Sequence, residues 1–179
     1  EEGYSVNGAT GSAKEYFDEQ FEGLIDFRFD VSEIVTLPGK MADYGGNMAN
    51  GEDKNPAQMV IEACQAVDDD IDFTIYDDDK DGEIDNVFIF FAGADEAEGA
   101  GEDCIWSHTW YIFEGTGQTV TLDGKMVNRY ACCSELSRRY HGRSYDETFT
   151  GIGTFCHEYS HTFGLPDFYD TDYEGSGGN

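Results

Sequence analysis

The longest uncharged apolar run in the sequence, residues 87–94, is eight residues long, and it is the feature that most constrains the fold. A helix needs about 20 apolar residues to cross a bilayer, so this run is too short to span a membrane. Residues 86–92 are rich in Val, Ile and Phe without polar alternation, a pattern typical of a strand buried on both faces. We therefore expect a central strand that other layers cover.

Composition agrees with one folded domain. The 179 residues are 39% hydrophobic and 15% aromatic, which is enough apolar material for a sizeable core. The chain has 38 Asp and Glu residues against 10 Lys and Arg residues, so its formal net charge is −28. Such a surface repels phosphate backbones and anionic lipids, which excludes a nucleic-acid-binding protein and a protein that binds acidic membranes.

Local patterns predict about three helices. A capping box opens a helix over residues 12–22, and an Asn-Pro pair opens a second helix over residues 55–68. A third helix is expected over residues 150–163, where Gly164 stops it and a proline follows. The Gly- and Asn-rich residues 38–55 indicate a long surface loop.

Further strands complete the expected fold. Apolar and charged residues alternate over residues 25–31, which predicts a strand with one buried face. Another strand is expected over residues 105–110, and a hairpin over residues 119–130 with Asp123-Gly124 at its turn. The sequence therefore predicts one α/β (α+β) domain with a mixed, twisted β-sheet and about three helices.

Residues 157–167 read His-Glu-Tyr-Ser-His-Thr-Phe-Gly-Leu-Pro-Asp and predict a catalytic zinc site. On a helix, His157 and His161 lie on one face, so both imidazoles can bind one zinc ion. Glu158 can accept the proton of the water that completes such a site. Gly164 allows the left-handed residue that ends the helix, and the reversed chain can bring Asp167 back as the third ligand.

Two alternatives concern this pattern. The third ligand could be a more distant acidic residue, as in thermolysin-like enzymes, but the spacing of the glycine turn favours Asp167. The other candidates after His161 are Asp170, Asp172 and Glu174. The pair could also be two surface histidines on an ordinary helix, which is a poor explanation because two of only four histidines flank a glutamate at the right spacing.

The pattern H-E-x-x-H-x-x-G-x-x-D, followed by Phe-Tyr-Asp-Thr-Asp, resembles the active-site helix and following loop of the immune inhibitor A family. These are secreted bacterial zinc metallopeptidases, relatives of the metzincins. Other blocks are similar in order and spacing, and the resemblance covers most of the chain. These blocks are residues 15–17, 36–38, 44–46, 85–88, 92–93, 105–108 and 110–111.

The resemblance implies a metzincin-like zincin catalytic domain that cleaves peptides as an endopeptidase. It implies that His157, His161 and Asp167 bind zinc and that Glu158 is the catalytic base, although metzincins more commonly have a third histidine where Asp167 stands. In such enzymes a lower lobe with a methionine turn follows the third ligand. Only 12 residues follow Asp167 here, and none is Met. We therefore expect residues 1–179 to form mainly the upper lobe of the catalytic domain, within a longer precursor, with the lower lobe missing.

An acidic run, residues 68–85, holds ten Asp and Glu residues and one Lys. Such a density repels itself unless a cation or solvent compensates for it. Carboxylates at alternating positions, with Gly82 at a sharp turn, indicate the start of a calcium-binding loop, although Phe88 at the twelfth position excludes an ordinary EF-hand. The alternative is a solvated acidic loop. The expected calcium ligands are Asp77, Asp79, Asp81, Glu83 and Asp85, completed by water or Asp72.

Other reactive side chains are expected to be structural. His108, between two tryptophans, is expected to be a hydrogen-bonded strand residue rather than a ligand. The basic residues 138–143 are expected to form a loop that pairs with the acidic surface. Cys156 and His157 point about 100° apart on a helix, so Cys156 is expected to be a buried core thiol. The five cysteines define no disulfide connectivity, although an extracellular setting would favour some pairing.

Three functions are consistent with these features. The first is a zinc endopeptidase acting on protein or peptide substrates. The second is a non-catalytic, calcium-stabilised extracellular binding module, which would predict damage to Glu158 or to the zinc ligands. The third is a zincin of another reaction class, because a fold alone does not fix the substrate. The intact motif favours the peptidase, and the scarcity of Lys with the excess of Asp and Gly favours a secreted or extracellular location.

Overall fold

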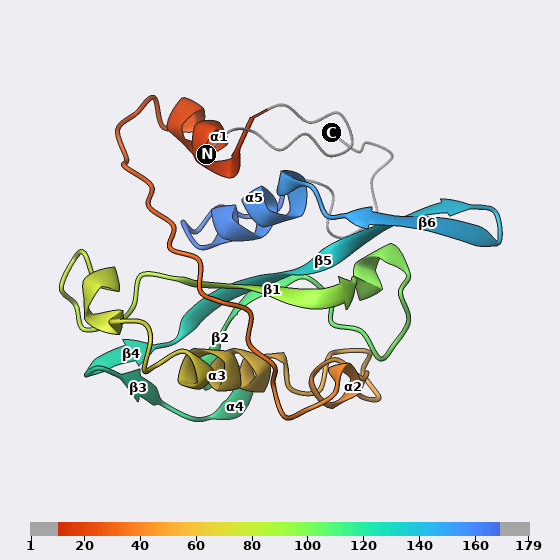
Figure 1. Cartoon of the computed structure of the whole chain (residues 1–179), viewed down its shortest axis with the longest axis horizontal. Helices are drawn as coiled ribbons and strands as arrows, with labels where there is room; N and C mark the ends of the chain where they lie inside the picture. The colour runs from red at the N-terminus through yellow and green to blue at the C-terminus, as the bar shows by residue number, and fades with distance from the viewer. Residues whose placement is uncertain (1–10, 169–179) are drawn as a thin grey trace.

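The structure is a computed structural model that describes residues 11–168. These residues form five α-helices, two short 3₁₀ helices and six strands (Figure 1). The α-helices are α1 (Ala13–Gln20), α2 (Met41–Tyr44), α3 (Pro56–Ala66), α4 (Ile112–Thr116) and α5 (Ile152–His161), and the 3₁₀ helices are Phe73–Tyr76 and Glu96–Glu98.

A mixed four-stranded sheet lies at the centre of the described residues. Strand β5 (Arg129–His141) pairs in parallel with β1 (Val87–Ala94) on one side and antiparallel with β2 (His108–Tyr111). Strand β6 (Ser144–Phe149) continues the sheet by pairing antiparallel with the second half of β5. The sequence predicts a mixed sheet, and β1 and β2 are the two of its four strands that were expected.

A separate hairpin joins β3 (Val120–Leu122) to β4 (Lys125–Val127) and confirms the hairpin prediction. Asp123 and Gly124 occupy its turn with φ of 50° and 79°. Two successive residues of positive φ are the geometry of the type I′ turn, whose twist matches that of the flanking strands.

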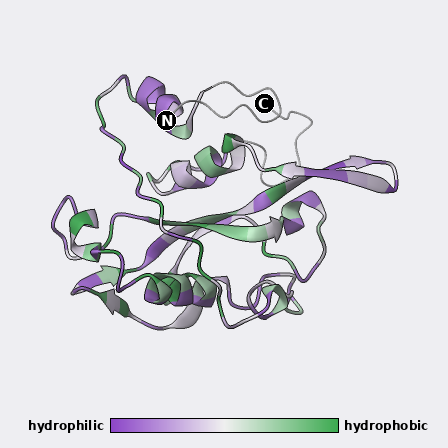
Figure 2. Ribbon diagram, viewed as in Figure 1, coloured by the Kyte–Doolittle hydropathy of each residue, from purple (hydrophilic) through white to green (hydrophobic). Residues whose placement is uncertain are grey.

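The sheet separates two apolar layers. Helix α5 covers one face and helix α3 lies on the other side (Figure 1). The larger core lies on the α3 side, where Val60, Ile105 and Tyr130 are each 0% exposed. A smaller core lies around α5 and includes Phe17 and Phe155. Figure 2 shows hydrophobic residues gathered on β1 and α3, while the outer side of α1 is hydrophilic.

The predicted first helix is confirmed as α1, but the strand predicted over residues 25–31 is wrong. Within the described chain this segment is extended and belongs to no strand. Phe27 is buried, and Phe29 packs edge-on against Phe155 of α5 with ring centroids 5.6 Å apart. The apolar alternation therefore reflects packing of an extended segment against α5 rather than pairing in a sheet.

The expected strand over residues 86–92 is present as β1, but the prediction that both faces are buried is wrong. Phe91 faces the larger core and is 5% exposed, whereas Phe90 is 61% exposed. Phe90 still stacks on Phe155, with ring centroids 5.7 Å apart. Because α5 is only ten residues long, it covers its face of the sheet incompletely.

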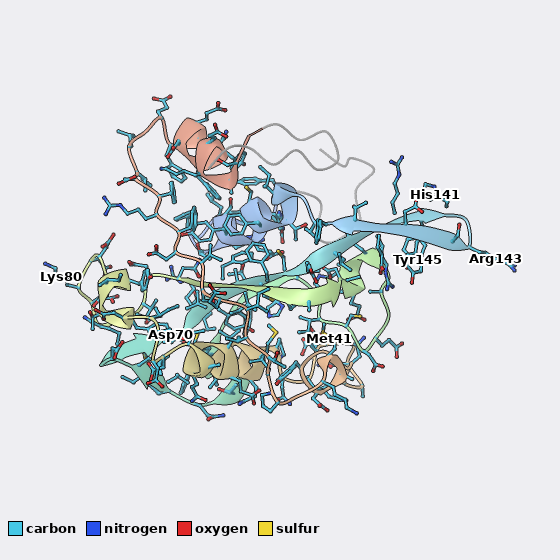
Figure 3. All side chains as sticks on the ribbon, in the orientation of Figure 1. Met41, Asp70, Lys80, His141, Arg143 and Tyr145 are labelled. Carbon is cyan, nitrogen blue, oxygen red and sulfur yellow. The ribbon has the colours of Figure 1, made fainter. Side chains whose placement is uncertain are left out.

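The basic residues 138–143 form the end of a projecting hairpin and not the expected loop. Strands β5 and β6 extend beyond the rest of the described chain, and Figure 3 shows His141, Arg143 and Tyr145 at the tip. The cluster does pair with acidic groups, as expected, but within the hairpin. Arg138 Nε lies 2.8 Å from a Glu147 oxygen, and His141 Nε2 lies 3.1 Å from Asp146 Oδ2.

The three predicted helices correspond to α1, α3 and α5, and the predicted strand over residues 105–110 corresponds to β2. Helices α2 and α4 raise the number of α-helices in residues 11–168 above the expected three. With four and five residues, they are too short to show helical periodicity. Helix α2 lies inside the expected loop over residues 38–55.

The structure bears on two further expectations. All five cysteines lie within residues 11–168 and are free, so the disulfides that an extracellular setting would favour are not formed. Cys156 is buried in the smaller core, as predicted. In the part of the chain that the structure describes, no helix has both the length and the apolar character needed to cross a bilayer.

Candidate metal centre

Helix α5 presents the histidine pair because of its local sequence and packing. Phe155 is buried and Tyr159 stacks on it with ring centroids 5.5 Å apart, so these residues fix the inner side of the helix. Residues four apart share a helix face. His157 and His161 therefore project together from another side, with ring centroids 4.7 Å apart.

The turn after α5 brings Asp167 to this pair. Gly164 has φ of 80°, a left-handed conformation that residues with a side chain rarely adopt, and its N–H donates to the His161 carbonyl at 2.8 Å. The chain then reverses, so that Asp167 Oδ1 lies 3.2 Å from His157 Nε2 and 3.3 Å from His161 Nε2. The two Nε2 atoms are 3.2 Å apart. The three atoms form a nearly equilateral triangle that could hold a metal ion.

Two features of this triangle fit a metal ion. Asp167 Oδ1 is buried and has no hydrogen-bond partner among residues 11–168, although a buried carboxylate oxygen ordinarily needs one. His161 Nδ1 lies 2.7 Å from the Leu165 carbonyl, which can only accept a hydrogen bond. This contact places the proton of the neutral ring on Nδ1 and leaves the Nε2 lone pair directed at the triangle.

Glu158 lies beside the triangle in a partly desolvated position. It is 7% exposed, and its Oε1 lies 4.0 Å from His157 Nε2. Thr109 Oγ1, on β2, is 3.2 Å from Glu158 Oε2 and donates to the Glu158 carbonyl at 2.6 Å. Burial raises the pKa of Glu158, and the neighbouring His157 and the Thr109 hydroxyl oppose that shift.

The end of α5 is held by the sheet. Arg129, the first residue of β5, donates from Nη1 to the Thr162 carbonyl at 2.8 Å. A guanidinium at a helix C-terminus satisfies a free carbonyl and complements the helix dipole. The same guanidinium lies 5.8 Å from the centre of the Tyr111 ring. Sequence reasoning missed both Thr109 and Arg129, because neither belongs to a local motif.

The acidic loop gathers three of the five predicted calcium ligands. Oxygens of Asp77, Asp79 and Asp81 lie within 4.8 Å of one another. Asp77 is buried, accepts hydrogen bonds from the backbone of Asp81 and Gly82, and pairs with Lys125 Nζ at 2.5 Å. That hydrogen bond lowers the pKa of Asp77. One carboxylate of the loop therefore already has a cation of its own.

The remaining predicted ligands of the loop lie at an adjoining cavity. Glu83 and Asp85 line a cavity of about 100 Å³ together with Asp79, Asp81 and Arg129. Asp85 Oδ2 also accepts from the Asp78 N–H at 3.0 Å. The structure thus brings the five residues to one loop but gathers only the first three at one point.

The other two histidines, His108 and His141, have contacts that fit structural roles. His108 Nδ1 lies 2.6 Å from the Trp106 carbonyl, and its Nε2 lies 2.8 Å from the Tyr130 hydroxyl. Burial lowers the pKa of His108. His141 lies at the tip of the projecting hairpin (Figure 3), where it pairs with Asp146. Asp170, Asp172 and Glu174, the alternative third ligands, lie outside the described residues.

A helix carrying H-E-x-x-H against a mixed sheet, with a carboxylate returned by a glycine turn, defines a metallopeptidase domain. All 179 residues match the family model of the immune inhibitor A peptidase M6 catalytic domain, and the chain belongs to this family. The resemblance inferred from the sequence and the expected metzincin-like fold class are confirmed.

Individual relatives agree with this assignment. The chain is 34% identical over 196 aligned positions to immune inhibitor A of Bacillus thuringiensis subsp. alesti, covering 92% of the chain and 26% of that protein. It is also 34% identical over 206 positions to the pre-pro-metalloprotease PrtV of Vibrio cholerae serotype O1 (strain M66-2), covering 97% of the chain and 21% of that protein. The chain thus spans about a quarter of the length of these relatives.

Proposed function

We propose that the chain is the catalytic part of a secreted zinc endopeptidase in which His157, His161 and Asp167 bind the zinc and Glu158 is the general base. The observation that carries this proposal is the triangle formed by two imidazole nitrogens and one carboxylate oxygen, with a second carboxylate beside it. The family supports a metal-dependent peptidase, and the geometry supports the particular metal and residues.

The size of the triangle fits zinc. The edge of a regular tetrahedron is about 1.63 times the distance from its centre to a corner. Edges of 3.2 to 3.3 Å therefore place all three atoms about 2.0 Å from a common centre, which is the zinc–nitrogen distance. Two imidazoles and one carboxylate are a ligand set of catalytic zinc, and three protein ligands leave a fourth position open.

In the proposed reaction, the zinc and Glu158 have separate roles. Bound zinc would supply a Lewis acid that polarises the peptide carbonyl and makes a water more acidic. Glu158 Oε1, on the triangle side, takes the proton of the attacking water and passes it to the leaving amine. Burial of Glu158 excludes bulk water, which strengthens the electrostatic interaction of the carboxylate with the reacting groups.

We also propose that the acidic loop binds calcium through Asp77, Asp79, Asp81, Glu83 and Asp85. Clustered carboxylate oxygens are the ligands that calcium prefers, and three of these residues already lie within reach of one ion. The ion pair between Lys125 and Asp77 indicates that the negative charge of the loop is partly neutralised without a bound metal ion. Calcium would then add to this neutralisation by drawing Glu83 and Asp85 inward.

The substrate and location follow from the same proposal. A metallopeptidase domain implies protein or peptide substrates, and one relative is named as a pre-pro-metalloprotease, a name that denotes a processed precursor. A secreted or extracellular location of the chain agrees with this name. The competing function, a non-catalytic calcium-stabilised binding module, would predict damage to the site, and its support is weakened because Glu158 and the three proposed ligands are intact in the sequence.

Zinc analysis and a peptidase assay of matched variants test the function. Wild type should contain about one zinc per chain, and His157→Ala should lose it because two remaining ligands hold zinc poorly. Glu158→Gln should retain the zinc and lose peptidase activity. His141→Ala, which removes an exposed histidine on the hairpin, should change neither property. Peptidase activity in zinc-loaded Glu158→Gln would refute the assigned base, and zinc retained by His157→Ala would refute the ligand set.

A further inference from the structure

The Glu158 side chain is held from outside its own helix. Its Oε2 lies 3.2 Å from Thr109 Oγ1, while its Oε1 lies on the side of His157. The two carboxylate oxygens are thereby distinguished: one faces β2 and the other faces the candidate metal centre. We propose that Thr109 is a positioning residue that aims the Glu158 carboxylate at the reacting groups, an inference that rests on the proposed function.

The same hydroxyl contacts the helix backbone. Near the end of α5, the Thr162 N–H bonds to the Tyr159 carbonyl instead of continuing the i to i+4 pattern to Glu158. The Glu158 carbonyl accepts from Thr109 Oγ1 at 2.6 Å instead. Thr109 therefore satisfies one of the carbonyls that a helix C-terminus leaves open, and it does so at the residue whose side chain is the base.

The hydroxyl itself sits on a fixed support. Thr109 lies on β2 opposite Ala131 of β5, which is 0% exposed at the centre of the sheet. A β-branched side chain on a strand has few accessible χ1 rotamers, so the hydroxyl direction is set by the strand backbone. Sheet and helix are thus joined at Glu158 through a stiff side chain, whereas a Glu side chain alone would sample several rotamers.

The hydroxyl has one proton and two nearby acceptors. When the hydroxyl donates to the Glu158 carbonyl, the hydrogen bond secures the helix. When it donates to the carboxylate, the hydrogen bond orients Oε2 and leaves Oε1 available. Rotation about one bond exchanges the two arrangements.

Steady-state kinetics of the zinc-loaded, full-length protease test the proposal with three substitutions. Thr109→Val keeps the shape and removes the hydroxyl, and kcat should fall about tenfold or more while KM changes less than about twofold, because orientation is lost and substrate contacts remain. Thr109→Ser keeps the hydroxyl and should stay within about threefold of wild type. Thr121→Val, on the exposed side of the β3–β4 hairpin, is the matched control and should behave as wild type.

A crystal structure of zinc-free Thr109→Val gives a second readout that does not depend on activity. The Glu158 carboxylate should move by about 1 Å or more, and Thr109→Ser should restore its position. A wild-type kcat for Thr109→Val, an unmoved carboxylate, or a fall in kcat matched by loss of zinc would overturn the proposal. If Thr109→Val fails to fold, Thr109→Ala compared with Thr109→Ser applies the same criteria.

The parallel Glu158→Gln variant separates this inference from the proposed function. Activity in Glu158→Gln would refute the base itself, whatever Thr109 does. An inactive Glu158→Gln beside a fully active Thr109→Val would refute only the positioning role.

Discussion

Asp53 is predicted to destabilise the protein at neutral pH. Burial, with the nearby charges of Glu96 and Asp95, raises its pKa from 3.8 to about 6, although the Trp106 N–H donates to Oδ2 at 3.0 Å. Its other oxygen, Oδ1, is buried and has no hydrogen-bond partner in the part of the chain that the structure describes. The folded state thus binds this proton more tightly than the unfolded chain does, so ionisation costs stability as the pH rises from about 4 to 6.

Asp53→Asn removes that cost while keeping an oxygen for the Trp106 N–H. A pKa difference of about two units corresponds to about 3 kcal/mol, which partial solvent access to the carboxyl reduces to about 1–2 kcal/mol. At roughly 2–4 °C per kcal/mol for a domain of this size, the melting temperature at pH 8 should rise by about 2–8 °C.

Thermal unfolding by circular dichroism measures the effect across pH. The gain should shrink as the pH falls from 6 toward 4, because the folded wild type then binds a proton that the unfolded chain still lacks, and it should vanish below about 4, where the carboxyl is neutral in both states. Asp69→Asn removes the same formal charge from an exposed position and should give a much smaller gain at pH 8. If Asp53→Asn melts at or below the wild-type temperature at pH 8, or if its gain does not change with pH, the assigned burial cost is wrong.

Three other perturbations test the fold and the proposed calcium site. Phe155→Ala should lower the free energy of unfolding by about 3–5 kcal/mol in urea titration, because it removes a large side chain from the smaller core around α5. A loss below about 1 kcal/mol would contradict that role. Gly164→Ala should cost about 1–2 kcal/mol through its positive φ, with no added clash, and an unchanged melting temperature would contradict the turn assignment. Calcium added to metal-stripped protein should raise the melting temperature, and Asp79→Ala with Asp81→Ala should abolish the rise; a calcium-independent wild type would refute the site.

The arrangement of the candidate metal centre was largely predictable from the sequence because its parts are local. His157, Glu158 and His161 occupy fixed positions on a single helix, and Gly164 reports the sharp reversal that follows. Asp167 needs only that reversal to reach the pair, and the structure places it there. Short-range geometry was therefore sufficient.

The elements that the sequence predicted wrongly depend on contacts with residues far away along the chain. Alternation over residues 25–31 identifies which side chains meet an apolar surface, but it does not reveal whether that surface is a strand or a helix. The β5–β6 hairpin was missed because its charged residues suggested a loop. Gly142, with φ of 70° between two polar strands, was the available turn signal.

Thr109 and Arg129 show a different limit. Each contacts α5 from another part of the chain: Thr109 lies 49 positions before Glu158, and Arg129 lies 33 positions before Thr162. No local periodicity encodes such a contact, since it arises only when the sheet and the helix pack together.

Zinc-edge anomalous diffraction from crystals of the zinc-loaded protein tests the central claim most directly. The account predicts one strong peak about 2.0–2.2 Å from His157 Nε2, His161 Nε2 and Asp167 Oδ1, with Glu158 close by but outside the ligand set. A peak centred elsewhere, a different residue in place of Asp167, or Glu158 bound directly to the zinc would contradict it.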